Sequence, residues 1–409
     1  MNKWLLFSAL ILSIVAALAA QEAAPYRLGI EQFSPDLLGK FTGKTNARVG
    51  LITNQSGKDQ KGNRSIDLLL KKGINVVMIF APEHGLHGTV SAGKKIDNSV
   101  DTATKLPITS LYTLGKKDNE TSYKDTLDAF IFDIQDVGMR HYTYSATLLS
   151  VLGVAAKQSI PLIVLDRPNP LGIIMEGAVS SIENSFLASV PIMLRHAMTM
   201  AEIARYCNSH VLTKPAQLHI VPLKDYSRKR QVAKLIAPLS PNIQNVQACE
   251  GYSFLGLLGE IQPFDVGVGT KDAFRIIGLP HTKLNKKQNK QLAALLQSKG
   301  IHTKSIDYYN QRKKKQYHGL KITHIPINSF SAFNTFLSIL AFCKQHNITL
   351  TLSKDFDAAL GSSIVRDYMS GLCSFEQLQK KINADLQAFY VKAKSAFIYE
   401  PLPKMVLVE

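Results

Sequence analysis

The sequence predicts an α/β protein built on a doubly wound, mostly parallel β-sheet. Four segments in the first half of the chain are predominantly apolar and read as strands; they span residues 48–53, 76–80, 129–132 and 162–165. Continuous apolar runs are typical of strands buried on both faces of a parallel sheet. Helices are expected at residues 65–72 and 144–158, and strand–helix–strand order at this spacing indicates a doubly wound domain.

The chain is long enough for two domains. It has 409 residues, of which 45% are hydrophobic and 19% charged, and this composition excludes a disordered or collagen-like chain. A basic, polar stretch at residues 224–234 marks a boundary, so a larger domain is expected at residues 26–230 and a smaller one at residues 231–409. A strand pattern at residues 320–325 and helices at 331–345 and 374–396 indicate that the smaller domain is α/β or α+β.

Charge and the N-terminus restrict the partners. The net charge of +17 favours an anionic partner. Lys3, an apolar run over residues 4–17 and the sequence Ala17-Leu18-Ala19 are typical of a secretory signal peptide, so removal of residues 1–20 is expected. An exported protein, periplasmic or secreted, does not meet nucleic acid, and signal cleavage leaves no segment to hold it in the membrane. Anionic polymers of the cell envelope are the expected partners.

Polar side chains follow all four predicted strands. These residues are, in chain order, Asn54, Glu83, His84, Asp133, Asp136, Asp166 and Arg167. The carboxyl ends of parallel strands meet at one edge of a sheet, and open α/β sheets bind ligands there. Loop capping explains any one of these residues, but it explains poorly why four loops carry carboxylates and cations together. We therefore expect one polar site at this edge.

Several common chemistries lack their sequence signatures. Gly57 and Gly62 do not have the spacing of a dinucleotide-binding loop, so no cofactor is expected. Glu83, His84 and His87 are metal-ligand types, but they lie in a loop rather than on a helix, and no metal is expected. The sequence supports a serine nucleophile even less, because it contains no G-x-S-x-G motif.

Five motifs in fixed order carry a resemblance to a known family. They read RVGLITNQSG from Arg48, PEHGLHG from Pro82, DIQDVGMRHYTY from Asp133, DRPNPLG from Asp166 and LRHAMTMAEIA from Leu194. Over residues 28–222 the chain resembles the exo-β-N-acetylmuramidase family of peptidoglycan-recycling glycosidases. The resemblance implies a Rossmann-like domain, a smaller C-terminal domain and an active cleft between them. It also implies hydrolysis of terminal, non-reducing N-acetylmuramic acid from peptidoglycan fragments.

The chain departs from the family pattern at three places. His141 stands where the family usually has an aromatic residue, and Gly172-Ile173-Ile174 replaces paired glycines. Residues 255–260 read LGLLGE, where the family has Ser-Glu-Gly-Arg-Gly-Thr. These departures keep open a second class of protein. An exported, non-catalytic paralogue that binds muropeptides or sugars would also be a two-lobed α/β protein with a polar cleft.

The resemblance, together with the chemistry of glycosidases, assigns roles. Glycoside hydrolysis needs a proton donor at the leaving oxygen and a second carboxylate at the anomeric carbon. Glu83 is assigned the acid/base role, and His84 either orients it or carries the proton. Asp133 and Asp166, with Asp136, are candidates for the second carboxylate. The residues expected to bind the sugar are Asn54, Gln135, Asp136, Arg140, Tyr142, Tyr144, Arg167, Asn169, Arg195 and His196. The arginines are expected at the lactyl carboxylate, and the tyrosines either stack on the sugar or pack a helix.

Overall fold

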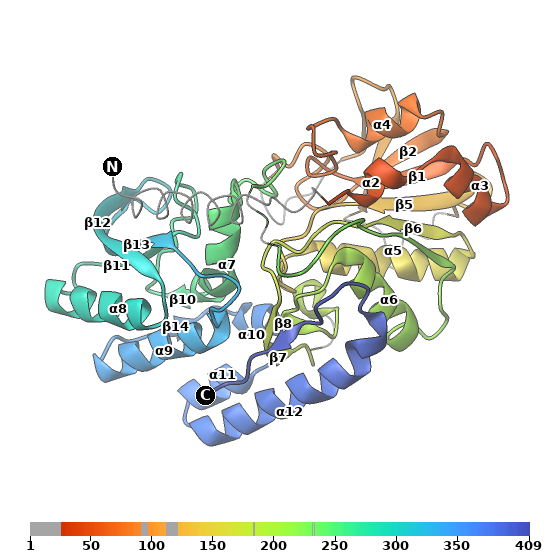
Figure 1. Ribbon diagram of the computed structural model, residues 1–409. Coiled ribbons are helices and arrows are strands. Elements are labelled where there is room, and N and C mark those ends of the chain that lie inside the picture. Colours follow the sequence, from red (N-terminus) through yellow and green to blue (C-terminus); the bar gives the residue numbers. More distant parts are fainter. Residues whose placement is uncertain (1–25, 91–96, 112–121, 183–184, 231, 233) are drawn as a thin grey trace, which may run out of the picture.

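The computed structural model describes residues 26–409 except residues 91–96, 112–121, 183–184, 231 and 233. The predicted signal peptide at residues 1–20 lies outside the described residues. Two lobes are visible in Figure 1. We call residues 26–221, which build the larger sheet, the first lobe, and residues 246–369, which build the smaller sheet, the second lobe.

The first lobe contains a seven-stranded sheet in the order β3-β4-β2-β1-β5-β6-β9. Its strands are β1 (Val49–Thr53), β2 (Val76–Ala81), β3 (Ser99–Val100), β4 (Pro107–Ser110), β5 (Ala129–Asp133), β6 (Leu162–Leu165) and β9 (Leu218–Val221). All neighbouring strands are parallel except β3, which is antiparallel to β4. The predicted doubly wound, mostly parallel sheet is confirmed.

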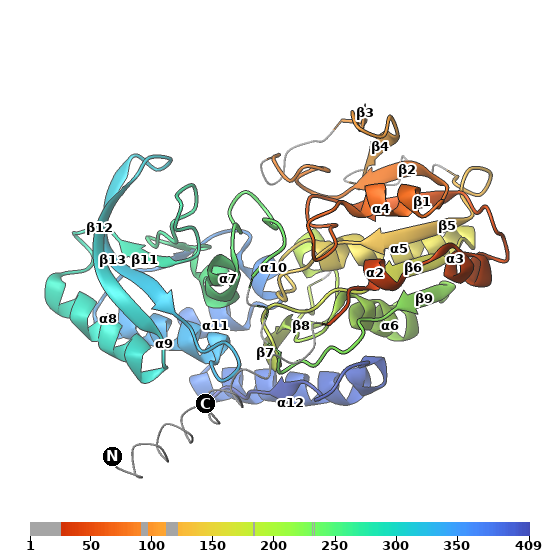
Figure 2. The same cartoon turned by 45° about the horizontal axis from the view of Figure 1, so that its top comes forward.

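Helices cover both faces of this sheet, as Figure 2 shows. One face packs against α2 (Gly29–Gln32), α3 (Pro35–Thr42) and α4 (Ser65–Lys71), and the other against α5 (Tyr144–Gln158) and α6 (Met200–His210). Every residue of β1, β5 and β6 is buried as a result, which explains why their sequences are continuously apolar.

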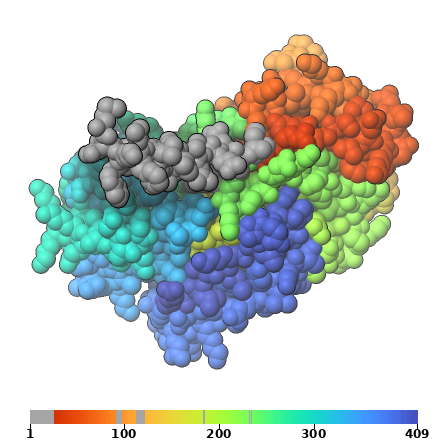
Figure 3. Space-filling view, viewed as in Figure 1, coloured from red at the N-terminus to blue at the C-terminus, as the bar shows by residue number. Residues whose placement is uncertain are grey.

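The end of the chain returns to the first lobe. A second sheet, in the order β15-β7-β8, joins β7 (Ile174–Val179) and β8 (Met193–Arg195) to β15 (Lys404–Met405). The long helix α12 (Phe375–Ala393), followed by the 3-10 turn η3 (Lys394–Ala396), carries the chain back to β7. In the space-filling view the dark-blue C-terminal residues lie against green residues of the first lobe (Figure 3). A further 3-10 turn, η2 (Phe186–Ala188), precedes β8.

The second lobe is α+β. Its main sheet is antiparallel, in the order β11-β13-β12, with strands β11 (Ile276–Leu279), β12 (His302–Asn310) and β13 (Lys315–His324). A short pair joins β10 (Ile261–Gln262) to β14 (Thr351–Leu352). The helices are α7 (Val246–Leu258), α8 (Lys286–Ser298), α9 (Ala332–Gln345), α10 (Phe356–Leu360) and α11 (Ile364–Met369). Across the described part of the chain, no helix combines the length and the apolar character needed to span a bilayer.

Candidate active site

The sheet reverses its direction of growth between β1 and β5. The chain passes from β1 to β2 on one side and later returns to β5 on the other, so the loops after β1 and β5 diverge. These loops are tied together: Ser56 Oγ accepts a hydrogen bond from the Gln135 N–H at 3.0 Å, and the Thr53 hydroxyl donates to the Asp133 carbonyl at 3.0 Å. Open α/β sheets bind ligands at such a switch point.

The loop after β2, which carries Glu83, is stabilised by a side-chain hydrogen bond of the next residue. His84 has a left-handed backbone, with φ of 70°, and its Nδ1 lies 2.7 Å from the Val90 carbonyl. A carbonyl only accepts, so Nδ1 carries the ring proton. Gly88 also has a positive φ, and a Cβ at this position would lie 2.3 Å from the Gln55 side chain. Glycine is therefore required where this loop passes Gln55.

Three buried tyrosines gather beside this loop. The hydroxyls of Tyr142 and Tyr144 donate to the same acceptor, the Leu239 carbonyl, at 2.7 and 3.3 Å. Their rings are nearly perpendicular, with centroids 4.9 Å apart. Tyr252, on α7 of the second lobe, lies 6.0 Å from the Tyr142 ring. We call these three residues the tyrosine cluster; it lies where the two lobes meet.

The charges of two carboxylates act on the tyrosine cluster. Burial raises the pKa of Tyr144 and of Tyr252. The negative charge of Glu260 raises the pKa of Tyr252 further, and those of Glu83 and Asp136 raise both pKa values. Glu83 and Asp136 are thus within electrostatic reach of the same two rings. The structure brings together one acid from the loop after β2 and one from the loop after β5.

Asp136 is buried, and only one of its two carboxylate oxygens accepts a hydrogen bond from the protein. Its Oδ2 accepts a hydrogen bond from the Gly138 N–H at 2.7 Å and lies 3.4 Å from His196 Nε2. His196 Nδ1 accepts from the Met198 N–H at 3.2 Å, so the ring proton is on Nε2, the nitrogen that faces Asp136. Asp136 Oδ1 has no hydrogen-bond partner, although the residue is only 5% exposed. It is therefore a buried carboxylate oxygen whose hydrogen-bonding capacity no protein group uses.

Asp133 is instead fully engaged. Its Oδ1 accepts from Arg167 Nε at 2.6 Å, and its Oδ2 accepts from Arg167 Nη2 at 2.8 Å and from the Ser65 hydroxyl. Both side chains of this ion pair are almost fully buried. The pair connects the carboxyl ends of β5 and β6, and this geometry does not support the predicted catalytic role of Asp133.

Asp166 faces a different region. Its Oδ1 accepts from the Ala201 N–H, at the start of α6, at 3.0 Å, and its Oδ2 accepts from the Tyr399 hydroxyl at 2.6 Å. Burial raises the pKa of Asp166 to about 6. The carboxylate connects β6 to α6 and to the returning C-terminal segment, so a catalytic role has no support from its contacts.

Arg140 and Arg195 are turned toward protein groups. Arg140 donates to the carbonyls of Leu187 and Ala359, each at 3.2 Å. Arg195 donates to Glu176 at 2.9 Å and to three carbonyls, those of Leu171, Ile327 and Phe330, at 2.7, 2.7 and 2.9 Å. Both side chains are about 1% exposed. Their predicted contact with a lactyl carboxylate has no support here.

The three predicted amides stabilise the loops at this edge. Asn54 Oδ1 accepts from Ser56, while Asn54 Nδ2 is buried without a hydrogen-bond partner. The other two amides donate to carbonyls: Gln135 to those of Asp136 and Pro168 at 2.8 and 2.7 Å, and Asn169 to that of Met198 at 2.9 Å. Asn54 is therefore the one of the three that keeps a buried donor for a ligand.

His141 behaves as a neutral aromatic ring. Burial, with a smaller contribution from Arg140, lowers the pKa of His141 to about 3. The ring stacks on Tyr252 with centroids 4.7 Å apart and an interplanar angle of 23°. A Cβ on Gly256 would lie 2.5 Å from His141 Nε2. Two of the departures from the family pattern, His141 and the residue 255–260 segment, thus pack against each other.

A small cavity of about 20 Å³ adjoins the tyrosine cluster. Ser56, Gln135 and Arg167 line it at the carboxyl ends of β1, β5 and β6, and Leu239 lines its other side. Glu83 and Asp136 do not border this cavity. The residues that line this cavity include no carboxylate.

Sequence reasoning missed three residues that shape the site. Tyr252 and Leu239 reach it from segments without a recognisable motif, so no local signal identifies them. Ser65 begins α4 directly after the loop that follows β1, and its position at this helix start was the one available signal. Among the described residues, one group of three metal-ligand side chains meets, and it lies in the second lobe rather than around His84 and His87.

Carboxylates at the carboxyl edge of a doubly wound sheet are the groups that a glycosidase uses. The comparisons with known proteins agree. The sequence profile "Exo-beta-N-acetylmuramidase NamZ, N-terminal" matches residues 49–247, and its C-terminal counterpart matches residues 250–399. The chain belongs to the exo-β-N-acetylmuramidase NamZ family, and it is a glycosidase related to enzymes that act on peptidoglycan.

Individual relatives are similar over nearly the whole chain. The peptidoglycan β-N-acetylmuramidase NamZ of Bacillus subtilis is 31% identical over 383 residues, which are 91% of each chain. A crystal structure of a DUF1343 family protein from Bacteroides fragilis matches with a TM-score of 0.76 and 27% identity, covering 92% of this chain and 99% of the other. A second such protein from the same organism, with a TM-score of 0.71, 23% identity and the same coverage, supports the fold alone.

Proposed function

We propose that this protein releases terminal, non-reducing N-acetylmuramic acid from peptidoglycan fragments as an exo-acting glycosidase. The observation that carries the proposal is a pair of carboxylates, Glu83 and Asp136, at the carboxyl edge of the sheet, whose charges both act on Tyr144 and Tyr252. The similarity to a peptidoglycan β-N-acetylmuramidase supplies the substrate class. The exo mode of action follows the family description.

We assign Glu83 as the acid that protonates the leaving oxygen and Asp136 as the second carboxylate. Among the three aspartates considered from the sequence, Asp133 and Asp166 have hydrogen-bond donors on both oxygens, whereas Asp136 Oδ1 has none. The Nε2–H of His196 lies 3.4 Å from the other oxygen, Oδ2. Asp136 therefore attacks the anomeric carbon or activates a water, depending on its distance from Glu83 across the bound sugar.

The lactyl carboxylate of muramic acid needs a cationic partner. Arg167 borders the cavity at the carboxyl edge, whereas Arg140 and Arg195 do not. We therefore assign this contact to Arg167, whose position is set by its ion pair with Asp133. A planar guanidinium matches a carboxylate in geometry, and two donors taken by Asp133 leave further N–H groups on Arg167.

Export is part of the proposal. Peptidoglycan lies outside the cytoplasmic membrane, and the N-terminal residues 1–20 have the composition of a cleaved signal peptide. The mature chain then begins near Gln21 and acts in the periplasm or in the external medium. N-terminal sequencing of the protein recovered from those fractions tests this directly.

The test uses the mature chain and two disaccharides that differ in which sugar is terminal. One has N-acetylmuramic acid at its non-reducing end, and the other has N-acetylglucosamine there. We expect hydrolysis of the first and none of the second, with loss of activity in Asp136→Asn and full activity in the control Asp385→Asn, an exposed residue of α12. Saturable binding of the first disaccharide without turnover would instead favour a sugar-binding paralogue.

A further inference from the structure

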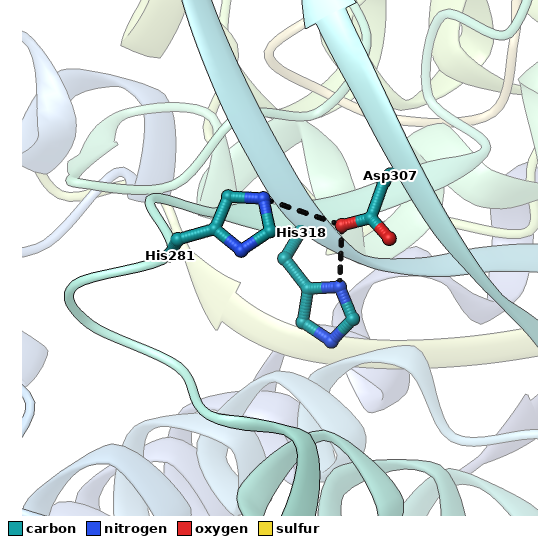
Figure 4. A group of neighbouring side chains, drawn as sticks. All are labelled: His281, Asp307 and His318. Atoms are coloured by element: carbon teal, nitrogen blue, oxygen red, sulfur yellow. Dashed lines mark hydrogen bonds and ion pairs between the residues drawn. The ribbon is translucent and has the colours of Figure 1, made fainter.

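We propose that the second lobe carries a binding site for one transition-metal ion, with Zn²⁺ as the ion it suits best. The ligands are His281, Asp307 and His318 (Figure 4). Their donor atoms all lie within 4.8 Å of one another, and no other group of three such side chains gathers among the described residues. Two imidazoles and a carboxylate are ligand types that Zn²⁺ prefers.

Two of the three ligands lie on neighbouring strands of one sheet, and the third lies in the turn after the next strand. Asp307 on β12 and His318 on β13 are direct cross-strand partners, so their side chains point to the same face of the sheet. Leu279, the last residue of β11, pairs with His318 on the other side, and His281 follows two residues later. Figure 4 shows both histidine rings turned toward Asp307. The backbone pairing, rather than flexible loops, sets most of this geometry.

The distances are close to those of a coordinated ion. Asp307 Oδ1 lies 3.3 Å from His281 Nε2 and 2.8 Å from His318 Nδ1. Zinc–ligand bonds of about 2.0–2.1 Å at tetrahedral angles put neighbouring donors roughly 3.3–3.4 Å apart. The first distance already fits, and the second needs to widen by about half an ångström. Small side-chain rotations of the exposed Asp307 are sufficient for this.

The exposure of the three ligand side chains indicates that a bound ion would be reachable from solvent. The His318 side chain is 9% exposed, whereas those of Asp307 and His281 are 59% and 53% exposed. Three protein ligands at the surface leave a fourth position to water or to a donor from a ligand. The site lies on the second lobe, far along the chain from Glu83 and Asp136. Because its ligands come from the segment after β11 and from β12 and β13, the ion would connect that segment to the β12–β13 hairpin. It takes no part in the hydrolysis proposed above.

The test measures metal binding itself and needs no enzyme activity. Tag-free mature protein, freed of metal with a chelator that is then removed, is titrated with Zn²⁺ by calorimetry and with Co²⁺ by visible absorption. We expect one ion per chain, a tetrahedral Co²⁺ spectrum, and a higher melting temperature when Zn²⁺ is bound. Asp307→Asn and His281→Ala, both at exposed positions that leave the fold intact, should weaken binding at least about tenfold.

The matched control is the double variant His302→Ala/His324→Ala. These two histidines lie on the same hairpin with ring centroids 5.5 Å apart, but they are not part of a three-ligand group. This variant should bind Zn²⁺ as the unmodified protein does. Binding that is absent, that has no fixed stoichiometry, or that survives both Asp307→Asn and His281→Ala would overturn the proposal. Two histidines that merely share a hydrogen-bond acceptor would then describe the cluster fully.

Discussion

Replacing Arg167 with methionine tests whether the Asp133–Arg167 pair stabilises the edge of the sheet. Arg167→Met keeps most of the side-chain volume but removes the donors to both Asp133 oxygens, which lie at 2.6 and 2.8 Å. Asp133 is 0% exposed and would keep the Ser65 hydroxyl as its remaining side-chain donor. Removing one partner of a buried ion pair costs about 3–5 kcal/mol, because the remaining charge is left uncompensated. We expect a loss of this size in the free energy of unfolding.

The assay is urea unfolding followed by circular dichroism, since Trp4 is the single tryptophan and lies in the predicted signal peptide. Lys381→Met is the matched control. It breaks an exposed i,i+4 pair with Asp385 on α12 and should cost at most about 0.5 kcal/mol. The double variant Asp133→Asn/Arg167→Met removes both charges and should recover part of the loss. If Arg167→Met costs no more than the control does, the pair does not hold the two strand ends together.

Two further predictions concern pH and the Glu83 loop. Burial raises the pKa of Asp166 to about 6. Between its unfolded value near 3.9 and this folded value, the folded state binds the proton and the unfolded state does not. Stability should therefore fall by on the order of 3 kcal/mol as the pH rises from about 4 to above 6, and this slope should flatten in Asp166→Asn, as measured by urea unfolding across pH. Gly88→Ala should lower the free energy of unfolding by about 1–2 kcal/mol for the left-handed backbone and by about 1–3 kcal/mol for the clash with Gln55. It should also lower kcat, because this loop carries Glu83. Gly73→Ala, which has a positive φ and nothing within 4 Å, should show the backbone penalty alone, in melting temperature and with normal kcat.

Much of the fold was predictable because local signals agreed with tertiary burial. The continuous apolar runs became β1, β2, β5 and β6 because helices cover both faces of the sheet. Thr199 and Glu202 have the spacing of a capping box, and they form one at the start of α6 in the structure. These elements are specified by short segments of chain. Neighbouring residues are sufficient to recognise them.

The β15-β7-β8 sheet was not predictable in the same way. Strand β7 contains Glu176 and Gly177, and neither residue is typical of a buried strand. Glu176 is tolerated there because Arg195 on β8 and backbone N–H groups at the start of α9 donate to it. Its partner strand β15 follows more than two hundred residues later. Pairing over such a separation leaves no local signal.

The candidate site shows the same division. The sequence places seven polar residues at one edge of the sheet, but it does not reveal which of them bind each other. The structure pairs Asp133 with Arg167 and leaves Asp136 Oδ1 without a hydrogen-bond partner. It also adds Tyr252 from the second lobe, which has no motif to identify it. The sequence shows which polar side chains lie at this edge, whereas long-range contacts decide which of them are already paired with other protein groups.

The most direct test of the account is kcat for Glu83→Gln and Asp136→Asn on two substrates. One is an unactivated disaccharide of N-acetylmuramic acid, and the other is a nitrophenyl N-acetylmuramide, whose leaving group needs no proton. A positioned acid contributes about 100- to 10,000-fold in rate. Glu83→Gln should therefore lose this factor on the disaccharide and much less on the nitrophenyl substrate.

Asp136→Asn should lose a comparable factor on both substrates, because its role at the anomeric carbon does not depend on the leaving group. Circular dichroism and melting temperature should show that both variants remain folded. Wild-type kcat for Glu83→Gln on both substrates, with Asp136→Asn equally active, would contradict the assignment of these two residues as the catalytic pair.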